Sequence, residues 1–545
     1  MKICEKQYII KLYNQLTVLL VVFFLCSSCL LYAQVPPIEW KVCLGGTGTE
    51  AGTFNFALPV LQTSDGGYIA AGNARTNNGI VQGIHSGSLD MWVVKTDSQG
   101  NFQWQNCLGS QGSESATSMV QTTDGGYIVA GYTTVSGGDV TGHHGSGDMW
   151  IVKLNAVGTI SWQKCIGGTG NEIAHSIKQT TDGGYIVAGT ADFNQGMVSG
   201  HHAPSQTSDM WVVKLDSLGN LVWQKCLGGS GEDIAYSVAQ TADGGYIVAG
   251  TTETKNNGDV TGNHTYYDVG SASYKASVDY WVVKLDSLGN LVWQKCLGGT
   301  GEDIAFSVQP TADGGYIVAG RTDSTNGDVS VSIGNRDAWI VKLNGIGEIL
   351  WQKSYGGTNN DIANFIQQTT DGGYIIAATT LSNDGDITEN KGQSDYWIVK
   401  IDSSGTLQWQ KTLGGSRVDT AYCVAQTADS GYIVAGVTRS LNGDVVGLHY
   451  NVDATDFWLV KFGPDTLSNE EFTKPVVTLY PNPVQDKLQL STTIKTIKVI
   501  DIYGKTLQIF TNVSEISLSH LANGIYLLTL EDENGTTTTQ KVVKK

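Results

Sequence analysis

The sequence is poor in basic residues. Its 545 residues include 33 lysines and arginines against 51 aspartates and glutamates, which gives a formal net charge of −18. Residues 1–34 and residues 474–545 each carry +2, so the stretch between them carries −22. An acidic surface of this size repels phosphate backbones and anionic lipid headgroups. Nucleic acid is therefore excluded as an expected partner, and neutral or cationic ligands suit the surface better.

Beyond the N-terminus, the sequence lacks any apolar segment long enough to cross a membrane. At the N-terminus, Lys2, Lys6 and Lys11 precede the apolar run LTVLLVVFFLCSSCLLYA. A charged segment followed by an apolar one is typical of a secretory signal, which we expect to cover residues 1–34. An uncleaved anchor and a lipidated Cys29 are the alternatives. After removal of the signal we expect no membrane span.

Catalytic signatures are also missing. The sequence contains no GxSxG nucleophile elbow, no HExxH helix and no phosphate-binding loop. Arginines outside the signal are few and widely separated, so a cluster that grips a substrate carboxylate is not expected. These arginines are Arg75, Arg321, Arg336, Arg417 and Arg439.

The nine cysteines do not form an evident disulfide framework. Three lie in the predicted signal, and Cys423 stands alone. The other five share one repeat position, three residues after a tryptophan: Cys43, Cys107, Cys165, Cys226 and Cys296. Equivalent positions of successive repeats are too far apart to bridge, because a disulfide needs Cα atoms within about 7 Å. We expect these cysteines to be small buried apolar residues.

What the sequence has in abundance is a repeat of 58 to 70 residues. The stretch DGGYI occurs six times between Asp65 and Ile375, and DSGYI takes its place at residues 429–433. All 14 tryptophans fall into two series. One series, mostly in WQK, is Trp40, Trp104, Trp162, Trp223, Trp293, Trp351 and Trp409. The other, two residues after an Asp, is Trp92, Trp150, Trp211, Trp281, Trp339, Trp397 and Trp458.

Each repeat predicts four β-strands. In the clearest copy these are residues 233–241, 245–252, 279–286 and 290–297, where apolar residues alternate or run together between glycine-containing turns. DGGYI is then the tight turn between the first two strands. Glycine reaches positive φ without steric cost, and Asp can bond its own backbone two residues on.

Seven four-stranded units at residues 35–463 predict an all-β fold, a seven-bladed β-propeller. The last unit stops at DFWLVKF and lacks a WQK strand, whereas the chain begins with an unassigned strand, EWKVC at residues 39–43. If that strand completes the last blade, both exposed edges vanish and the ring is closed. The alternative is an open solenoid, for which no capping repeat is evident.

A polar linker at residues 464–474 leads to a second domain at residues 475–545. It contains LYPNPV (479–484), VIDIYGK (499–505) and LANGIYLLTL (521–530), and it ends in KVVKK (541–545). With these motifs the domain resembles the C-terminal sorting domain, type A, of the type IX secretion system. The residues that match the family's motifs are Tyr480, Pro481, Asn482, Pro483, Gly504, Lys505, Gly524 and Tyr526.

The resemblance implies a small Ig-like β-sandwich after the propeller. It also implies export through the periplasm to the outer cell surface or the medium, contact with the type IX secretion machinery, and removal of the domain during export. The propeller repeats in turn resemble glycine-rich β-propeller repeats of secreted bacterial proteins of unassigned function. The stretch TSDGGY at residues 63–68 also resembles an Asp-box, a structural hairpin turn that carries no active site.

One carboxylate precedes the first strand of every unit: Glu50, Glu114, Glu172, Asp233, Asp303, Asp361 and Asp419. The first strand of a propeller blade lines the central channel, so these seven groups could gather at one mouth and bind a metal such as Ca²⁺. The alternative is that each accepts backbone N–H bonds within its own LGGxG turn. We favour the turn role, because the residue recurs with the turn that needs it.

The loops between second and third strands vary most, and variable loops on a rigid scaffold are a usual place for binding. Two contain GHH, at residues 142–144 and 200–202, which suggests either a transition-metal site or ordinary surface histidines. The longest loop runs from Lys255 to Val278 and carries three tyrosines, which offer flat apolar faces and hydroxyl groups to a ligand. They are Tyr266, Tyr267 and Tyr274, and their alternative role is to cover a neighbouring blade.

Two function classes remain. The first is a non-enzymatic surface module that binds a glycan or an extracellular protein through the variable-loop face. The second is an extracellular polysaccharide hydrolase or lyase that uses acidic residues of that face. The near-identity of the units favours the first, since a catalytic centre normally breaks the symmetry of a repeat. We therefore expect a secreted or cell-surface binding protein with no assigned catalytic residue.

Overall fold

The computed structural model describes residues 34–545 apart from 51–57, 86–88, 203–206, 269, 272, 450–454, 466–476, 478, 502–504 and 532–536. The predicted signal therefore lies outside the described residues, except for its last one. The chain divides into two compact units, Met1–Thr466 and Leu467–Lys545. Strands and loops make up the described residues of both, and none of these residues forms a helix that could cross a membrane.

The described residues of the first unit form seven four-stranded antiparallel sheets, the blades, and one small hairpin. Blade 1 is β2 (Val60–Gln62), β3 (Tyr68–Ala74), β4 (Asp90–Thr96) and β5 (Phe102–Leu108); blade 2 is β6 (Glu114–Gln121), β7 (Tyr127–Thr133), β8 (Asp148–Leu154) and β9 (Ile160–Ile166); blade 3 is β10 (Glu172–Gln179), β11 (Tyr185–Ala191), β12 (Asp209–Leu215) and β13 (Leu221–Leu227); blade 4 is β14 (Asp233–Gln240), β15 (Tyr246–Thr252), β18 (Asp279–Leu285) and β19 (Leu291–Leu297). Blade 5 is β20 (Asp303–Pro310), β21 (Tyr316–Thr322), β22 (Asp337–Leu343) and β23 (Ile349–Tyr355); blade 6 is β24 (Asp361–Gln368), β25 (Tyr374–Thr380), β26 (Asp395–Ile401) and β27 (Leu407–Leu413); blade 7 is β28 (Asp419–Gln426), β29 (Tyr432–Thr438), β30 (Asp456–Phe462) and β1 (Ile38–Leu44). The hairpin, inserted between β15 and β18, is β16 (Thr265–Asp268) and β17 (Ser273–Ala276).

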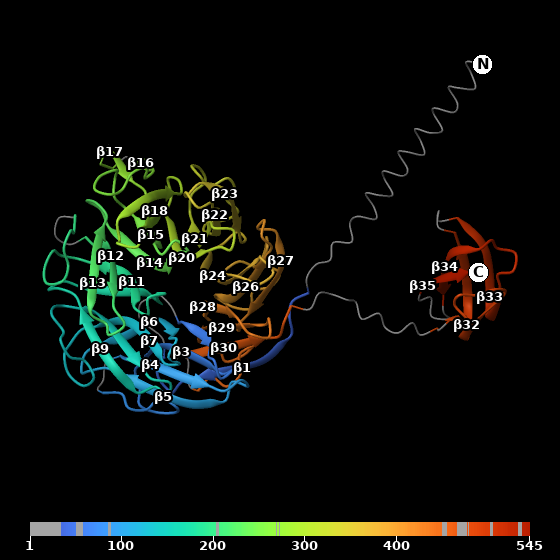
Figure 1. Ribbon diagram of the computed structural model, residues 1–545, viewed down its shortest axis with the longest axis horizontal. Coiled ribbons are helices and arrows are strands. Elements are labelled where there is room, and N and C mark those ends of the chain that lie inside the picture. The colour runs from blue at the N-terminus through green and yellow to red at the C-terminus, as the bar shows by residue number, and fades with distance from the viewer. Residues whose placement is uncertain are drawn as a thin grey trace, which may run out of the picture. The chain divides into compact units, whose positions relative to one another are not determined.

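The blades form a ring with their first strands around the central axis and their fourth strands outside (Figure 1). This confirms the predicted seven-bladed propeller. The N-terminal strand β1 pairs with β30 as the fourth strand of blade 7, so the ring is closed by strands from opposite ends of the unit. A hydrogen bond also links blade 7 to blade 1: the amide N–H of Ala428 donates to Oε1 of Gln62 at 2.7 Å.

The two tryptophan series have different roles. Third-strand tryptophans such as Trp281 are fully buried, and its Nε1 donates to Oε1 of Gln294 in the WQK stretch of the same blade at 2.8 Å. Fourth-strand tryptophans pack on the next blade: the rings of Trp293 and Tyr316 have centroids 5.8 Å apart. That tyrosine is the one in DGGYI. The repeated motif therefore supplies both a turn and one half of each contact between blades.

The DGGYI turn has the geometry that the sequence predicts. In the first copy Gly66 has a φ of 83°, and Oδ1 of Asp65 accepts the amide N–H of Gly67 at 3.0 Å. The same carboxylate pairs with the buried Lys95 of β4 at 3.0 Å. In the seventh copy Ser430 stands where the others have glycine, and it adopts a φ of 65°. A serine here is strained, since positive φ favours glycine.

The described cysteines are all free, as predicted from their spacing, and all but one are fully buried. Cys226, for example, belongs to the apolar cluster between blades 3 and 2 and is 6% exposed. The five equivalent cysteines therefore act as small apolar residues of the blade interfaces.

Among its described residues, the second unit has five strands: β31 (Leu479–Tyr480), β32 (Lys487–Ile500), β33 (Thr506–Ser517), β34 (Gly524–Glu531) and β35 (Thr537–Lys544). They pair in the order β31-β32-β34-β35, and β33 also pairs with the long strand β32. Alternate residues of these strands, among them Leu488, Ile497 and Leu528, form its buried core. The unit is strand-rich as predicted, and its Ig-like character stays a prediction.

Candidate functional site

Six of the seven repeat carboxylates begin a first strand, whereas Glu50 precedes β2 by ten residues, and all seven are fully buried. These six accept a backbone N–H of the turn four residues before them: Oδ2 of Asp303, for example, accepts the amide of Gly299 at 2.9 Å and the hydroxyl of Ser324 at 2.7 Å. Glu50 accepts the hydroxyl of Thr76 at 3.3 Å. None of the seven lines the cavity in the central channel. These contacts agree with the turn role that the sequence favours.

Each of these carboxylates also faces an aspartate of the preceding blade. The pairs are Asp456 with Glu50, Asp90 with Glu114, Asp148 with Glu172, Asp209 with Asp233, Asp279 with Asp303, Asp337 with Asp361, and Asp395 with Asp419. The first glycine of the LGG stretch lies between them. A Cβ at Gly228 would be 2.5 Å from Oδ2 of Asp233 and 3.0 Å from Oδ1 of Asp209, which explains the glycine.

Burial raises the pKa values of five of these acids, and the facing carboxylate raises them further. The pKa reaches about 7 for Glu50, Glu172 and Asp233, and about 6 for Asp303 and Asp395. Two carboxylates in one desolvated space cannot both ionise without a large cost. Protonation of one carboxyl group of a pair relieves this repulsion.

The Ca²⁺ site predicted for the seven repeat carboxylates stays a prediction. Within the part of the chain that the structure describes, no three His, Cys, Asp or Glu side chains are grouped as metal ligands. The seven repeat carboxylates are distributed one to a blade interface, and six of them use part of their hydrogen-bonding capacity on the preceding turn.

The histidines of the GHH loops have a structural partner. Nδ1 of His144 lies 2.8 Å from Oδ2 of Asp148, and Nδ1 of His202 lies 3.0 Å from Oδ2 of Asp209. The same pair recurs in loops without the motif, at His85, His264 and His449. Aligning single histidines rather than the GHH pair would have revealed this recurrence.

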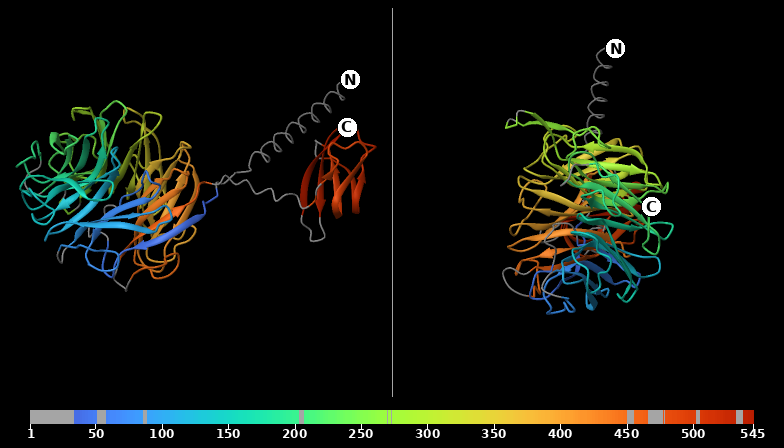
Figure 2. Two further views of the ribbon diagram at one scale, coloured as in Figure 1. Left: turned by 60° about the horizontal axis from the view of Figure 1, so that its bottom comes forward. Right: turned by 90° about the vertical axis from the view of Figure 1, so that its left-hand side faces the viewer.

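The three predicted tyrosines lie on the hairpin β16–β17, which projects from blade 4 (Figure 1 and Figure 2). Tyr266, Tyr267 and Tyr274 are 40%, 52% and 62% exposed, so no neighbouring blade covers them. Tyr267 and Tyr274 are directly opposite each other, with ring centroids 5.2 Å apart. An ion pair between Lys275 and Asp268 at 2.8 Å flanks them.

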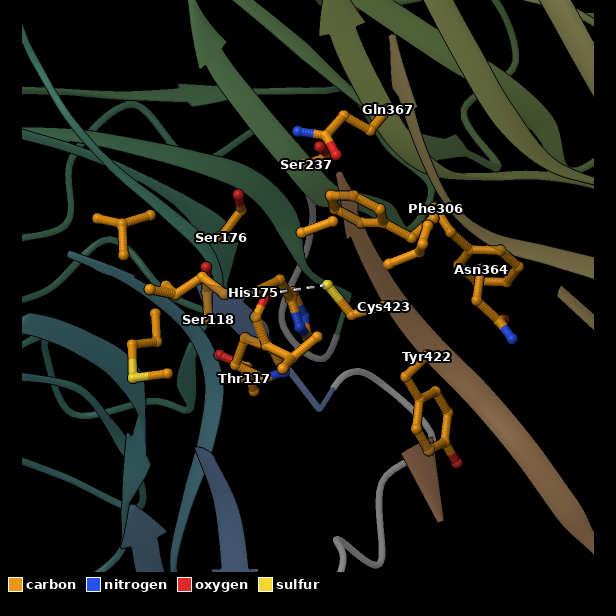
Figure 3. A pocket seen from close by; sticks show the side chains of 18 of the residues that line it. Thr117, Ser118, His175, Ser176, Ser237, Phe306, Asn364, Gln367, Tyr422 and Cys423 are labelled. Atoms are coloured by element: carbon orange, nitrogen blue, oxygen red, sulfur yellow. Dashed lines mark hydrogen bonds between the residues drawn. The ribbon is translucent and has the colours of Figure 1, made fainter. Parts of the chain in front are cut away.

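The sequence analysis missed a second place where the blades differ, the wall of the central channel. A bulge in six first strands inserts one residue after a constant alanine, and that residue lines a cavity of about 240 Å³. Figure 3 labels five of these side chains around one space: Thr117, His175, Phe306, Asn364 and Tyr422. The sixth, Tyr236, lines the same cavity. The variation of the six against constant neighbours was visible in the aligned repeats.

The sorting-motif residues hold the second unit together. Oδ1 of Asn482 accepts the amide N–H of Val543, and its Nδ2 donates to the carbonyl of Lys541, both at 2.9 Å, so the YPNP stretch is fastened to the last strand. The hydroxyl of Tyr526 donates to the carbonyl of Ala522 at 2.8 Å. Lys505 closes a turn with Asp501, whereas Gly504 lies outside the described residues.

This unit belongs to a known family: residues 478–545 match the family model of the secretion system C-terminal sorting domain. The protein is therefore a substrate for export by type IX secretion to the cell surface or the extracellular space. The match confirms the predicted sorting domain and the predicted localisation.

One curated relative is similar over part of the chain. Over 239 residues the protein is 24% identical to the regulatory protein FlaEY of Caulobacter vibrioides. The match covers 42% of this chain and 25% of that protein, so the similarity concerns about a quarter of the relative's length.

Solved structures with a similar course of the chain include the Pan2 WD40 domain of Neurospora crassa. It is 9% identical with a TM-score of 0.41, and the match covers 78% of this chain and 97% of that one. A second is a polysaccharide lyase of family PL25, an ulvan lyase, which is 10% identical with a TM-score of 0.42 over 78% of this chain and 96% of that one.

Proposed function

We propose that the exported protein is a non-enzymatic binding module for neutral or cationic glycans, and that hairpin β16–β17 carries its contact surface. The observation that supports this proposal is the group of three exposed tyrosines on an element that no other blade has among the described strands. A tyrosine ring gives a sugar a flat apolar face, and its hydroxyl adds hydrogen bonds. The acidic propeller disfavours polyanionic chains.

A glycan array with the wild-type chain and the double variant Tyr266→Ala with Tyr267→Ala tests the proposal. Aromatic contact residues typically contribute about 1–3 kcal/mol each, so we expect the double variant to lose at least about tenfold in affinity. Its melting temperature should stay nearly unchanged, because the rings are exposed. Leu288→Ala, which removes a turn side chain that is 68% exposed, is the matched control.

Several outcomes would contradict the proposal. Absence of glycan binding would do so, and capture of an extracellular protein that depends on the same tyrosines would favour the protein partner instead. A double variant that unfolds but keeps its affinity per folded molecule would show that the hairpin packs rather than binds. Release of new reducing ends from a polysaccharide that contains a glycan bound on the array would favour the hydrolase or lyase alternative.

We further propose that the sorting domain is removed during export, so that the mature protein lacks most of residues 475–545. Mass spectrometry of the surface or medium protein checks this. Detection of the terminal peptide KVVKK in the exported form would contradict removal. Export of a chain truncated before residue 475 would contradict the need for the domain.

A further inference from the structure

The central channel is a feature that the glycan site does not use. Its cavity of about 240 Å³ is lined by residues from all seven first strands, β2, β6, β10, β14, β20, β24 and β28. This volume lies below the range of about 300–1,000 Å³ that is usual for ligand pockets. The space therefore fits a molecule with one ring better than a polymer chain.

The charge of the lining is opposite to that of the protein. Lys178 lines the cavity, and the lining contains no aspartate or glutamate among the residues that the structure describes. The Lys178 side chain makes no ion pair with any described residue. Burial lowers its pKa, as expected for an ammonium group without a counter-ion. Desolvation also lowers the pKa of His175 to about 4, so this histidine is neutral at pH 7.

The side chains that line the cavity also differ in kind from one blade to the next. His175, Tyr236 and Phe306, from three successive blades, form an aromatic arc with ring centroids 5.3 and 5.5 Å apart. Beyond the arc, blades 6 and 7 contribute the polar side chains of Asn364 and Tyr422 (Figure 3). A cavity wall that carries one cation and three aromatic rings can recognise a ring with an acid group.

We propose that the central channel binds a small organic monoanion, a carboxylate attached to a single ring, with the carboxylate at Lys178 and the ring against the aromatic arc. A charge-assisted bond to a carboxylate supplies the counter-ion that Lys178 lacks. The acidic exterior repels polyanions, which limits the ligand to a molecule of low charge. The site is on first strands and is independent of the hairpin site proposed above.

The test measures binding of four defined probes to the full chain by isothermal titration calorimetry. Benzoate and D-glucuronate are the acids, and benzamide and D-glucose are their neutral counterparts. We expect at least one acid to bind in the millimolar range or tighter, and its neutral counterpart to bind at least about tenfold more weakly. A disaccharide that ends in glucuronate distinguishes a free acid from the end of a saccharide chain.

Lys178→Met keeps the length of the side chain and removes its charge. We expect it to weaken binding of the acid at least about tenfold and to leave the weak binding of the neutral probe unchanged. Lys225→Met, on the outer strand β13, is the matched control and should bind like the wild type. Equal binding of acid and neutral probes, unchanged acid binding by Lys178→Met, or no binding of either acid would overturn the proposal.

A second measurement needs no variant, in case Lys178→Met does not fold. Limited acetylation of lysines, followed by peptide mass spectrometry, compares the modification rates of Lys178 and Lys225. The bound acid should slow acetylation of Lys178 at least severalfold and leave Lys225 unaffected. Equal rates with and without the acid, at a concentration that saturates the calorimetric signal, would place that binding elsewhere and overturn the assignment to the channel.

Discussion

The interfaces between blades and the wall of the central channel are built in part by the same first strands, yet they differ in how strictly they repeat. At the interfaces one set of contacts recurs: the fourth-strand tryptophan on the DGGYI tyrosine, and the carboxylate pair around the first glycine. In the channel, the bulge residue differs between blades, from Thr117 to Phe306 to Asn364. The residues that repeat from blade to blade are therefore the ones that hold neighbouring blades together. The residues that vary line the central channel.

This difference has a physical cause. Every interface has the same geometry, so the same set of side chains fits each of them. A change in any copy leaves a void or an unpaired buried group. The channel wall borders an open space, where a side chain can change size without displacing a neighbour. A ligand on the axis meets seven blades at once, and it can be recognised in one orientation only if those blades differ.

The largest expected effect comes from opening the ring where it is closed, in blade 7. There β1, from the N-terminal end of the propeller, pairs with β30, from its C-terminal end. Deletion of residues 35–46 removes β1 and the contact of Trp40 with Tyr68. It exposes the edge of β30 and opens the ring between blades 7 and 1. We expect the melting temperature to fall by about 10 °C or more, or folding to fail. Thermal unfolding followed by circular dichroism measures this.

Replacing residues 266–275 by a short glycine linker is the control for that deletion. It removes a similar number of residues from an exposed hairpin, and the melting temperature should change little. A truncated chain without residues 35–46 that stays monomeric, soluble and as stable as the wild type would show that the ring does not depend on β1.

The next effect is the pH dependence of the interfaces. The pKa values of Glu50, Glu172 and Asp233 are raised to about 7 in the folded protein, so the folded state binds protons that the unfolded state releases above pH 4 to 5. Stability from these groups is complete at low pH and is lost as pH rises through about 7. Each group contributes up to about 1.4 kcal/mol per pH unit to the slope. Urea unfolding at pH 5, 6, 7 and 8 measures it.

Asp233→Asn should flatten this slope, because an amide next to Asp209 stays neutral at every pH. The control is Asp182→Asn in a DGGYI turn. Hydrogen bonds and the Lys214 charge outweigh desolvation there and lower the pKa of Asp182 to about 2, so its stabilisation is lost as pH falls from about 4 to 2. A wild-type stability that rises between pH 5 and 8 would contradict the raised pKa values of these buried acids.

The sequence could predict the features that repeat. The positions of DGGYI and of the two tryptophan series predict seven blades, and the unassigned EWKVC strand predicts how the ring closes. The pairing of Asp209 with Asp233 could not be read in this way, because each aspartate belongs to a different repeat and only the fold brings them together. The channel wall was missed for the opposite reason: its residues differ, and the search for a repeat passes over them.

The smallest expected effect comes from two single substitutions in blade 5, one at the interface with the neighbouring blade and one in the channel wall. At each place an aromatic residue is changed to threonine, the residue that blade 2 has in the channel wall. Tyr316 is 5% exposed and packs on Trp293 at the interface. Tyr316→Thr leaves a void there and should cost about 3 kcal/mol. Phe306 lines the channel, where the space is already open, and Phe306→Thr should cost about 1 kcal/mol or less.

Urea unfolding of both variants at one pH gives the two free energies on the same scale. The comparison is sharp because the residues are of similar size and lie on adjacent strands of one sheet, β20 and β21. Equal losses would mean that the channel wall is packed as tightly as the interfaces, and its variation would then need another explanation than freedom from packing. A small loss at Phe306 together with weaker binding of the ring acids would show that this position serves recognition rather than the ring.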